Sequence, residues 1–454
     1  METRGASKAA ETSSITKLEI ISNKDESKKV SLLGGTDAPG PRLFRMMYYE
    51  SILQDTIKAE VIFTDTGGAI DGKSVIEGLP LVGTEEVNIA FQDNQQNKIK
   101  LNMYVNKVTP IDEDTRKSSV QLNLVSEEFL RNEEGDSRLN VRFDGKISDH
   151  IIKILKTFLK TKKPLDIEPT SNNYNFIGNN RKPYYALNWL SKTSIPENAG
   201  KKGSSAGFFF FETSEGFKFK SIDGLFAQEK NKSYIYNESP DRNSVLCPGN
   251  SDIPAGYDGK VLSHQSDNTI NAQSKFQMGA YSTRLVVFDP YTCRYQVIKQ
   301  TADETKSGTK LGGKDLPTFN KRFNRDFTRT TYMLSDTGTL PSGSSAQQIS
   351  KAKEQNFEIP QVLNQAIRRY NQMFAGMKTI TIAGDFSLHA GDVIFVDAPG
   401  RNAEKNDQID KEYGGLYIIA DLCHYVSTKE TYTKLNLVRD SFGRKGNHTT
   451  NIPL

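Results

Sequence analysis

Short runs in which apolar and polar residues alternate occupy most of the first 132 residues. The runs are rich in Val, Ile, Phe and Tyr, and turns such as Thr66-Gly67-Gly68 separate them. Many short alternating runs with intervening turns are typical of an antiparallel sandwich or barrel. The runs lie at 18–21, 30–33, 57–63, 87–91, 99–105 and 120–125. We therefore predict a first β-barrel over residues 15–132, preceded by a flexible arm at 1–14.

After residue 132 the apolar residues recur at helical spacing. From Ile147 to Leu159 they return every three or four positions, and Pro164 ends the run. A second helix is predicted from Pro183, and a hairpin with two Phe-rich strands follows it. We predict that residues 133–228 form a small mixed α/β domain.

Alternating runs return in the last third of the chain. A helix predicted from Pro360 has apolar residues on one face, and four strands follow it. These strands are expected at 379–382, 393–396, 416–420 and 432–438. We predict a second β-barrel domain over residues 229–442 and a polar C-terminal tail at 443–454.

The middle of the second domain has the weakest pattern. Strands are predicted at 284–288 and 295–298, whereas polar Gly/Ser-rich stretches at 305–314 and 335–350 predict loops. These features indicate an inserted segment around 285–350, whose boundaries and fold the pattern does not define.

Two segments in the first and last thirds of the chain share a short sequence motif. VQLNLVSEEF at 120–129 matches TKLNLVRDSF at 433–442 in Leu-Asn-Leu-Val and in the closing Phe. Acidic residues, Glu127 and Asp440, lie at the same offset. Because each copy closes a group of strands, we interpret the match as a duplication. The predicted fold is thus mainly β with α+β insertions: two similar antiparallel β-barrels and a small helical or mixed domain.

Composition excludes several classes of protein. A chain of 454 residues with 34 Gly and 17 Pro can bury several cores and is neither collagen nor low-complexity. Its apolar runs are too short to span a bilayer, and residues 1–16 lack the apolar stretch of a secretory signal. Cys247, Cys293 and Cys423 share no C-x-x-C spacing, which argues against both a disulfide framework and a zinc site.

The net charge of +4 is unevenly distributed. Acidic residues outnumber basic ones in residues 1–150, and basic ones predominate in the remainder. This asymmetry predicts a head-to-tail contact between copies or a preference for a charged partner.

The motifs that could carry chemistry are weak. The stretch 308–314 has the spacing of a phosphate-binding loop, but Asp315 follows where Ser or Thr would bind magnesium, so we expect a surface loop. Cys423 and His424 are neighbours in a predicted strand and must face opposite sides, with a core Cys and a surface His expected. We predict no catalytic, cofactor-binding or metal-binding residues.

Two alternative functions remain open. The acidic pairs Glu85-Glu86, Glu127-Glu128 and Glu133-Glu134 invite a cell-wall hydrolase, although clustered acids on a β-surface are expected to be solvated. Residues 319–329 interleave Phe with Lys and Arg, a pattern found in single-stranded nucleic-acid binders. A surface that faces a protein partner is the preferred interpretation of this stretch.

The order of the elements and motifs along residues 17–442 resembles the central hub proteins of contractile-tailed phage baseplates. These hubs are related to the hub portion of type VI secretion spike proteins. The resemblance is carried by the helix around Ile151, by His424 and by the segments 79–89, 120–129, 207–222, 384–395, 414–417 and 435–440.

The resemblance implies a homotrimer whose subunits each supply two similar barrels. Six similar units in a three-fold assembly would join a six-fold tail tube to a three-fold spike. The implied partners are the spike, the tube and other baseplate proteins, with no cofactor. Genomic DNA would pass through the lumen without specific binding. The implied location is the virion tail, assembled in the host cytoplasm.

Overall fold

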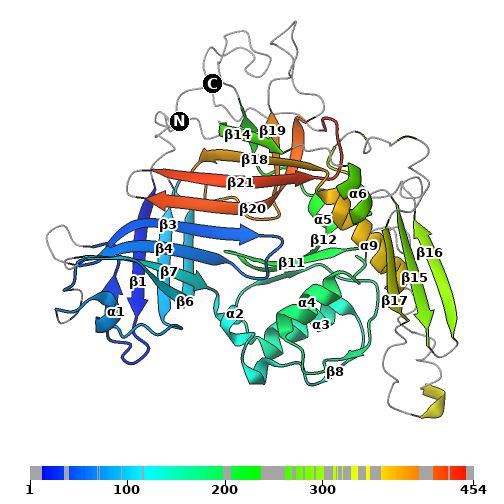
Figure 1. The fold of residues 1–454 in the computed structure, drawn as a ribbon, viewed down its shortest axis with the longest axis horizontal. Coiled ribbons are helices and arrows are strands. Elements are labelled where there is room, and N and C mark those ends of the chain that lie inside the picture. Colours follow the sequence, from blue (N-terminus) through cyan, green and yellow to red (C-terminus); the bar gives the residue numbers. More distant parts are fainter. Residues whose placement is uncertain are drawn as a thin grey trace, which may run out of the picture.

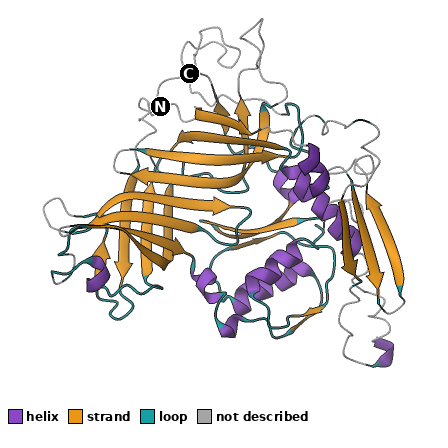
Figure 2. Cartoon of the chain, in the orientation of Figure 1, coloured by secondary structure: helices purple, strands orange, loops and turns teal. Residues whose placement is uncertain are grey.

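The computed structural model has a mainly β fold, in which helices gather beside one large sheet (Figures 1 and 2). The predicted mainly β class is confirmed. The structure describes residues 13–34, 40–68, 70, 72–93, 95–114, 117–197, 206–236, 261–267, 272–279, 282–290, 293–300, 310–312, 314, 320, 329–335, 344–347, 359–397, 413–427 and 430–445. Most of the predicted arm and C-terminal tail lies outside these residues.

Thirteen strands build the large sheet, and every neighbouring pair is antiparallel except β13 with β19. The order is β14-β18-β21-β20-β3-β4-β7-β6-β5-β1-β2, with β19 beside β20 and β13 beside β19. The bounds are β1 Ser14–Ile21, β2 Lys29–Ser31, β3 Arg42–Ser51, β4 Lys58–Asp65, β5 Glu86–Gln92, β6 Lys98–Glu113, β7 Ser118–Val125, β13 Ser233–Ile235, β14 Val261–Asp267, β18 Gly376–Ala383, β19 Val393–Asp397, β20 Gly415–Ser427 and β21 Thr431–Arg439.

The alternating pattern decides which side chains reach the core. In β7, Val120, Leu122 and Leu124 are buried, whereas Gln121 and Asn123 between them are partly exposed. The buried side chains of β7 belong to the same apolar cluster as those of β18 and β21. The first and last thirds of the chain therefore share one core. This sharing opposes their separation, because each Å² of apolar surface kept from water contributes about 25 cal/mol.

The same strand order occurs twice in the large sheet. The order β3-β4-β7-β6-β5-β1 in the first half corresponds to β14-β18-β21-β20-β19-β13 in the second half. Corresponding strands also follow one another in the same sequence along the chain. β7 and β21, which contain the two Leu-Asn-Leu-Val segments, hold the same position. One difference is that β1 is antiparallel to β5, whereas β13 is parallel to β19.

Two pairs of β-bulges also fall at corresponding positions in the two halves. Asn106 of β6 and Ala420 of β20 are both extra residues, each opposite the same Leu-Asn step of the neighbouring strand. Phe44 of β3 and Leu262 of β14 form a second matching pair. A bulge interrupts pairing at one specific residue. Matching bulges therefore support the predicted duplication more strongly than a shared strand order does.

The two predicted barrels are halves of one curled sheet rather than two closed barrels. Residues 421–427 of β20 pair with residues 45–51 of β3, so the edge of one half continues into the other. The physical reason is that an unpaired strand edge exposes a row of backbone donors and acceptors, which this pairing satisfies. The predicted domain boundaries stay predictions.

A mixed α/β region lies beside the large sheet and packs around its own aromatic core. Its mixed character was predicted. The helix predicted from Ile147 is α-helical at first and then widens into one π-helical turn. The elements are α2 Glu127–Arg131, η1 Gly135–Ser137, β8 Arg142–Phe143, α3 Ile147–Lys153, η2 Ile154–Phe158, β9 Leu165–Ile167, β10 Phe176–Ile177, α4 Pro183–Ser191, β11 Phe208–Thr213, β12 Gly216–Ser221 and α5 Ile222–Phe226.

A three-stranded sheet is inserted between β14 and β18. Two of its strands were predicted, whereas the third, which runs parallel to β15, was missed. The elements are α6 Ala272–Met278, β15 Thr283–Asp289, β16 Arg294–Gln300, β17 Arg329–Leu334 and α9 Ile359–Met373. One further short helix, α1 (Val75–Gly78), lies in the first half of the large sheet.

Candidate assembly interface

The seam between the two halves of the large sheet is the pairing of β20 with β3. It runs without interruption over residues 421–427 and 45–51. At one end, the Ser51 hydroxyl donates a hydrogen bond to the Asp421 carboxylate at 2.6 Å. The seam thus combines a backbone ladder with a side-chain contact, and it shows how one half-sheet of this type joins another.

β6 holds in the first half the position that β20 holds in the second. Its early residues pair with β5, and residues 104–113 pair with β7. On the other side of residues 107–113, where β20 has β3, none of the described strands is paired. Ile111 is 53% exposed there, and Pro110 lacks a backbone donor, as is typical of an edge.

β14 holds the position that corresponds to β3. It pairs with β18 on one side, and it ends the described sheet on the other. Its bulged residue Leu262 is 49% exposed. The internal seam joins β20 to β3. Within the described residues, the chain therefore has one open edge equivalent to that of β20, on β6, and one equivalent to that of β3, on β14. Such edges are templates for pairing with another chain.

Glu50, near the end of β3, ties three parts of the fold together. Its carboxylate accepts hydrogen bonds from the backbone N–H groups of Ser214 at 2.8 Å and Ala390 at 3.0 Å. Nδ1 of His389 lies 3.4 Å from the same carboxylate. Burial opposes ionisation of Glu50, but His389 and the two N–H groups hold its pKa below the ordinary value. Despite burial, Glu50 in turn raises the pKa of His389.

A second buried cluster fastens the mixed α/β region to the first half-sheet. Nζ of Lys163 lies 2.6 Å from both the Glu128 and Glu212 carboxylates. Glu212 also accepts hydrogen bonds from the Thr56 hydroxyl at 2.9 Å and the Ile57 N–H at 3.2 Å. Burial raises the pKa of Glu212. Burial also disfavours the Lys163 cation, but the two carboxylates outweigh it and raise the Lys163 pKa.

The expectation that the paired acids are solvated is wrong for two of them. Glu128 is buried against Lys163, and Glu85 is fully buried. The Glu85 carboxylate accepts the backbone N–H groups of Val82 and Gly83 at 2.8 and 3.0 Å. Burial of these carboxylates is tolerated because backbone N–H groups and the Lys163 ammonium group replace their contacts with water. The sequence pattern does not show where such donors lie.

Cys423 and His424 face opposite sides of β20, but in the reverse of the expected arrangement. His424 is fully buried and Cys423 is partly exposed. Nδ1 of His424 lies 2.9 Å from the Thr433 hydroxyl, and its ring stacks on Tyr48 at the seam. Burial lowers the His424 pKa to about 4 and raises the Cys423 pKa to about 11. A neutral imidazole with these contacts fits the core.

The stretch 308–314 was expected to be a surface loop. Its described residues, 310–312 and 314, instead pack against the fold. Leu311 is fully buried. The N–H of Leu311 donates to Asp440 at 3.1 Å, and that of Gly312 donates to Ser441 at 2.8 Å. This segment therefore closes over the turn that follows β21, a role that a loop composition does not predict.

Of the basic and aromatic stretch 319–329, only Asn320 and Arg329 fall among the described residues. Arg329 donates a hydrogen bond to the Met278 carbonyl at 3.0 Å. In the described part of the chain, no cluster of three or more His, Cys, Asp or Glu side chains could hold a metal ion. That part also contains no helix with the length and apolar character needed to cross a membrane.

No family model and no curated protein sequence matches the chain. Solved structures do match its fold. A tail protein from Neisseria meningitidis MC58 aligns with a TM-score of 0.50 and 10% identity, covering 93% of this chain and 96% of that protein. The 43 kDa tail protein of prophage MuSo2 from Shewanella oneidensis has a TM-score of 0.51 and 9% identity, with coverages of 93% and 98%.

A weaker likeness links the chain to a type VI secretion system component of E. coli, which is described as similar to T4 bacteriophage tail proteins. The TM-score is 0.41 at 10% identity, with coverage of 97% of this chain and 80% of that one. At the level of the fold, the two stronger matches confirm the resemblance predicted from the sequence. Over nearly its whole length, the chain has the fold of phage tail proteins.

Proposed function

We propose that the protein is the structural hub of a phage tail baseplate. As a homotrimer it joins the six-fold tail tube to the three-fold spike and continues the DNA channel. Two observations support this proposal: the fold shared with two tail proteins and the duplicated half-sheet within one chain. Three such chains present six similar units, which suit both a three-fold and a six-fold neighbour.

The observation that carries the proposal is the internal seam. In the seam, Cys423 of β20 lies opposite Tyr49 of β3. On the two open edges, Thr109 of β6 holds the position that Cys423 holds in β20, and Asp267 of β14 holds the position that Tyr49 holds in β3. A seam between two copies would therefore place Thr109 opposite Asp267 of the next chain. Three copies would close a ring in which internal and intermolecular seams alternate, leaving no edge of this kind open.

The function of such a ring is mechanical. It holds the spike, contacts the tube and other baseplate proteins, and lets genomic DNA pass through its lumen without specific binding. Backbone ladders between subunits can do this work without a catalytic residue, a cofactor or a metal. The corresponding location is the tail of the virion, after assembly in the host cytoplasm.

Light scattering coupled to size-exclusion chromatography tests the oligomeric state. A trimer of the 50.8 kDa chain has a mass of about 152 kDa. Negative-stain images of the same fraction should show rings with a central channel. A species that stays monomeric at every concentration, including after the spike protein is added, would contradict the proposal.

A further inference from the structure

The loops that precede the corresponding strands β5 and β19 are a further duplicated element. We call residues 79–85 the first loop and residues 386–392 the second loop. In the first loop, the N–H of Thr84 donates to a carbonyl of β6 at 2.7 Å, and in the second loop, the N–H of Gly391 donates to the corresponding carbonyl of β20 at 2.8 Å. Thr84 and Gly391 also share a positive φ, of 70° and 91°. The two loops therefore have the same backbone path.

An acidic residue closes each loop on its own backbone. The Glu85 carboxylate accepts the N–H of Val82 at 2.8 Å, and the Asp392 carboxylate accepts that of His389 at 3.0 Å. Each acceptor lies three residues after its donor, so Val82 and His389 are the corresponding tips of the two loops. Glu85 also accepts the N–H of Gly83 at 3.0 Å. The shape of the first loop is therefore fixed by bonds within the loop.

The tip of the second loop is packed at the internal seam, whereas the tip of the first loop is exposed. The His389 side chain is 13% exposed, and its Nδ1 lies 3.4 Å from the Glu50 carboxylate near the end of β3. The N–H of Ala390 donates to the same carboxylate at 3.0 Å. Val82, by contrast, is 84% exposed, and the N–H of Gly83, which corresponds to Ala390, donates within its own loop. Among the described residues, no strand holds beside the first loop the place that β3 holds beside the second.

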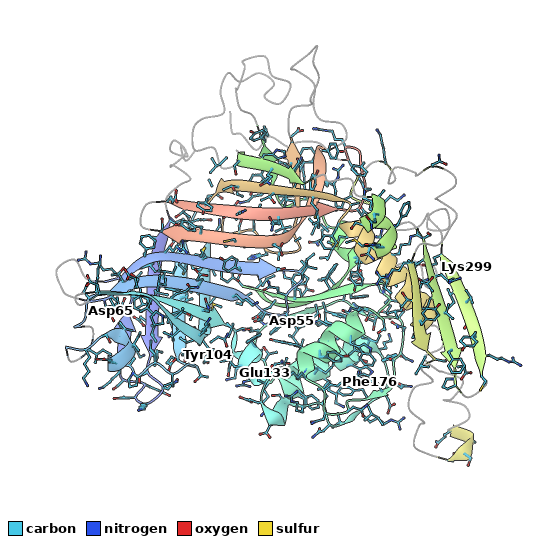
Figure 3. The ribbon with its side chains drawn as sticks, in the orientation of Figure 1. Asp55, Asp65, Tyr104, Glu133, Phe176 and Lys299 are labelled. Atoms are coloured by element: carbon cyan, nitrogen blue, oxygen red, sulfur yellow. The ribbon has the colours of Figure 1, made fainter. Side chains whose placement is uncertain are left out.

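The first loop lies where the open edge of β6 begins. Tyr104 of β6, labelled in Figure 3, lies opposite Glu86, the first residue of β5 after this loop. The open edge follows a few residues further along β6. In the proposed ring, Asp267 of the next chain lies opposite Thr109 on this edge. The end of β14 would therefore come beside the first loop, as the end of β3 with Glu50 comes beside the second.

We propose that the first loop is a second contact between neighbouring chains, in which Val82 packs against the next chain at the end of its β14. A single exposed apolar residue is common on protein surfaces. The occupant is inferred to be a second copy of this chain, because the second loop packs in the same way against β3, the strand to which β14 corresponds. Burial of the Val82 side chain would favour association. This inference rests on the proposed ring and adds to it a contact outside the β6–β14 ladder.

A dilution series followed by light scattering tests the contribution of the tip to the trimer. Val82→Ser should raise the protein concentration at which half of the trimer has dissociated by at least about tenfold, because most of the apolar contact is lost. Val82→Ile keeps the apolar tip and should stay close to the wild type. The hydrogen bond to Glu85 comes from the backbone of Val82, so both monomeric variants should unfold at the same urea concentration as the wild type.

Photo-crosslinking tests where the tip lies. A benzophenone amino acid in place of Val82 should crosslink two chains, and mass spectrometry should locate the acceptor next to Asp267 of the neighbouring chain. The matched control carries the same group in place of Tyr295, which is 70% exposed on the inserted sheet, and should not give this crosslink.

The outcomes separate this contact from the ring itself. If the wild type stays monomeric even with the spike protein, both the hub function and the loop contact are wrong. If the wild type forms a trimer that Val82→Ser does not weaken, the loop contact alone is wrong. Crosslinks from position 82 that fall away from the end of β14 would also overturn the loop contact and leave the ring standing.

Discussion

At the scale of single residues, buried charges lie where separate parts of the chain meet. Glu50 contacts the hairpin of the mixed α/β region and the loop before β19, and Lys163 joins that region to the first half-sheet. Each charge is compensated by hydrogen bonds or by an opposite charge, which is the condition under which burial is tolerated. Such clusters fix how neighbouring parts fit together.

The Glu50–His389 pair predicts a pH dependence of stability. The raised pKa of His389 adds stability that is complete below the ordinary value of 6.5 and is lost as pH rises through the folded-state value. The lowered pKa of Glu50 adds stability that is complete above 4.5 and is lost at lower pH. His389→Gln should therefore cost most, about 1–2 kcal/mol, between these values.

Denaturant unfolding of the wild type and His389→Gln at several pH values measures this effect. The difference in free energy of unfolding should shrink as pH rises above 6.5. Glu215 and Asp392 also face His389, so Glu215→Gln serves as a control that should retain most of the dependence. A difference that is the same at every pH would contradict the assignment.

Lys163 predicts a large effect on stability. Lys163→Met leaves the Glu128 and Glu212 carboxylates, which are 4% and 0% exposed, without their cation. Breaking a buried pair from one side costs about 3–5 kcal/mol. Adding Glu212→Gln should restore part of this loss, because it removes one uncompensated charge. Equal stabilities of the wild type and Lys163→Met in urea unfolding would show that the cluster does not stabilise the fold.

At the scale of elements, the sequence predicts where strands lie better than it predicts which strands pair with each other. The two Leu-Asn-Leu-Val segments correctly indicated a duplicated unit, since the alternating Leu residues of β7 and β21 have to face a core. The seam escaped prediction because pairing between β20 and β3 depends on backbone edges, which any sequence can offer. The burial of His424 was not predicted because its hydroxyl partner, Thr433, and the ring stacked on it, Tyr48, come from other strands.

The open edges predict a specific pattern of hydrogen exchange. In a trimer, the amides of residues 107–113 and 261–267 should be protected about as well as those of 421–427 in the internal seam, because all three take part in ladders. In a diluted monomer the first two segments should exchange faster, whereas 421–427 should not change. Identical exchange of 107–113 in both states would place the intermolecular contact elsewhere.

At the scale of the whole molecule, one continuous sheet replaces the two separate barrels that the sequence suggested. The β20–β3 ladder hydrogen-bonds the two half-sheets to each other, and the proposed trimer repeats the same kind of seam between chains. The inserted sheet lies apart from both open edges (Figure 1).

The most direct test of ring closure is a disulfide across the proposed intermolecular seam. Opposed residues of antiparallel strands have Cα atoms about 4.5–5.5 Å apart, within the range that a disulfide spans. Thr109→Cys/Asp267→Cys should therefore oxidise to a covalent trimer on a non-reducing gel. The out-of-register control, Thr109→Cys/Leu262→Cys, should not do so. Absence of intermolecular crosslinks in the first variant, or equal crosslinking in both, would contradict a trimer closed by β6 and β14.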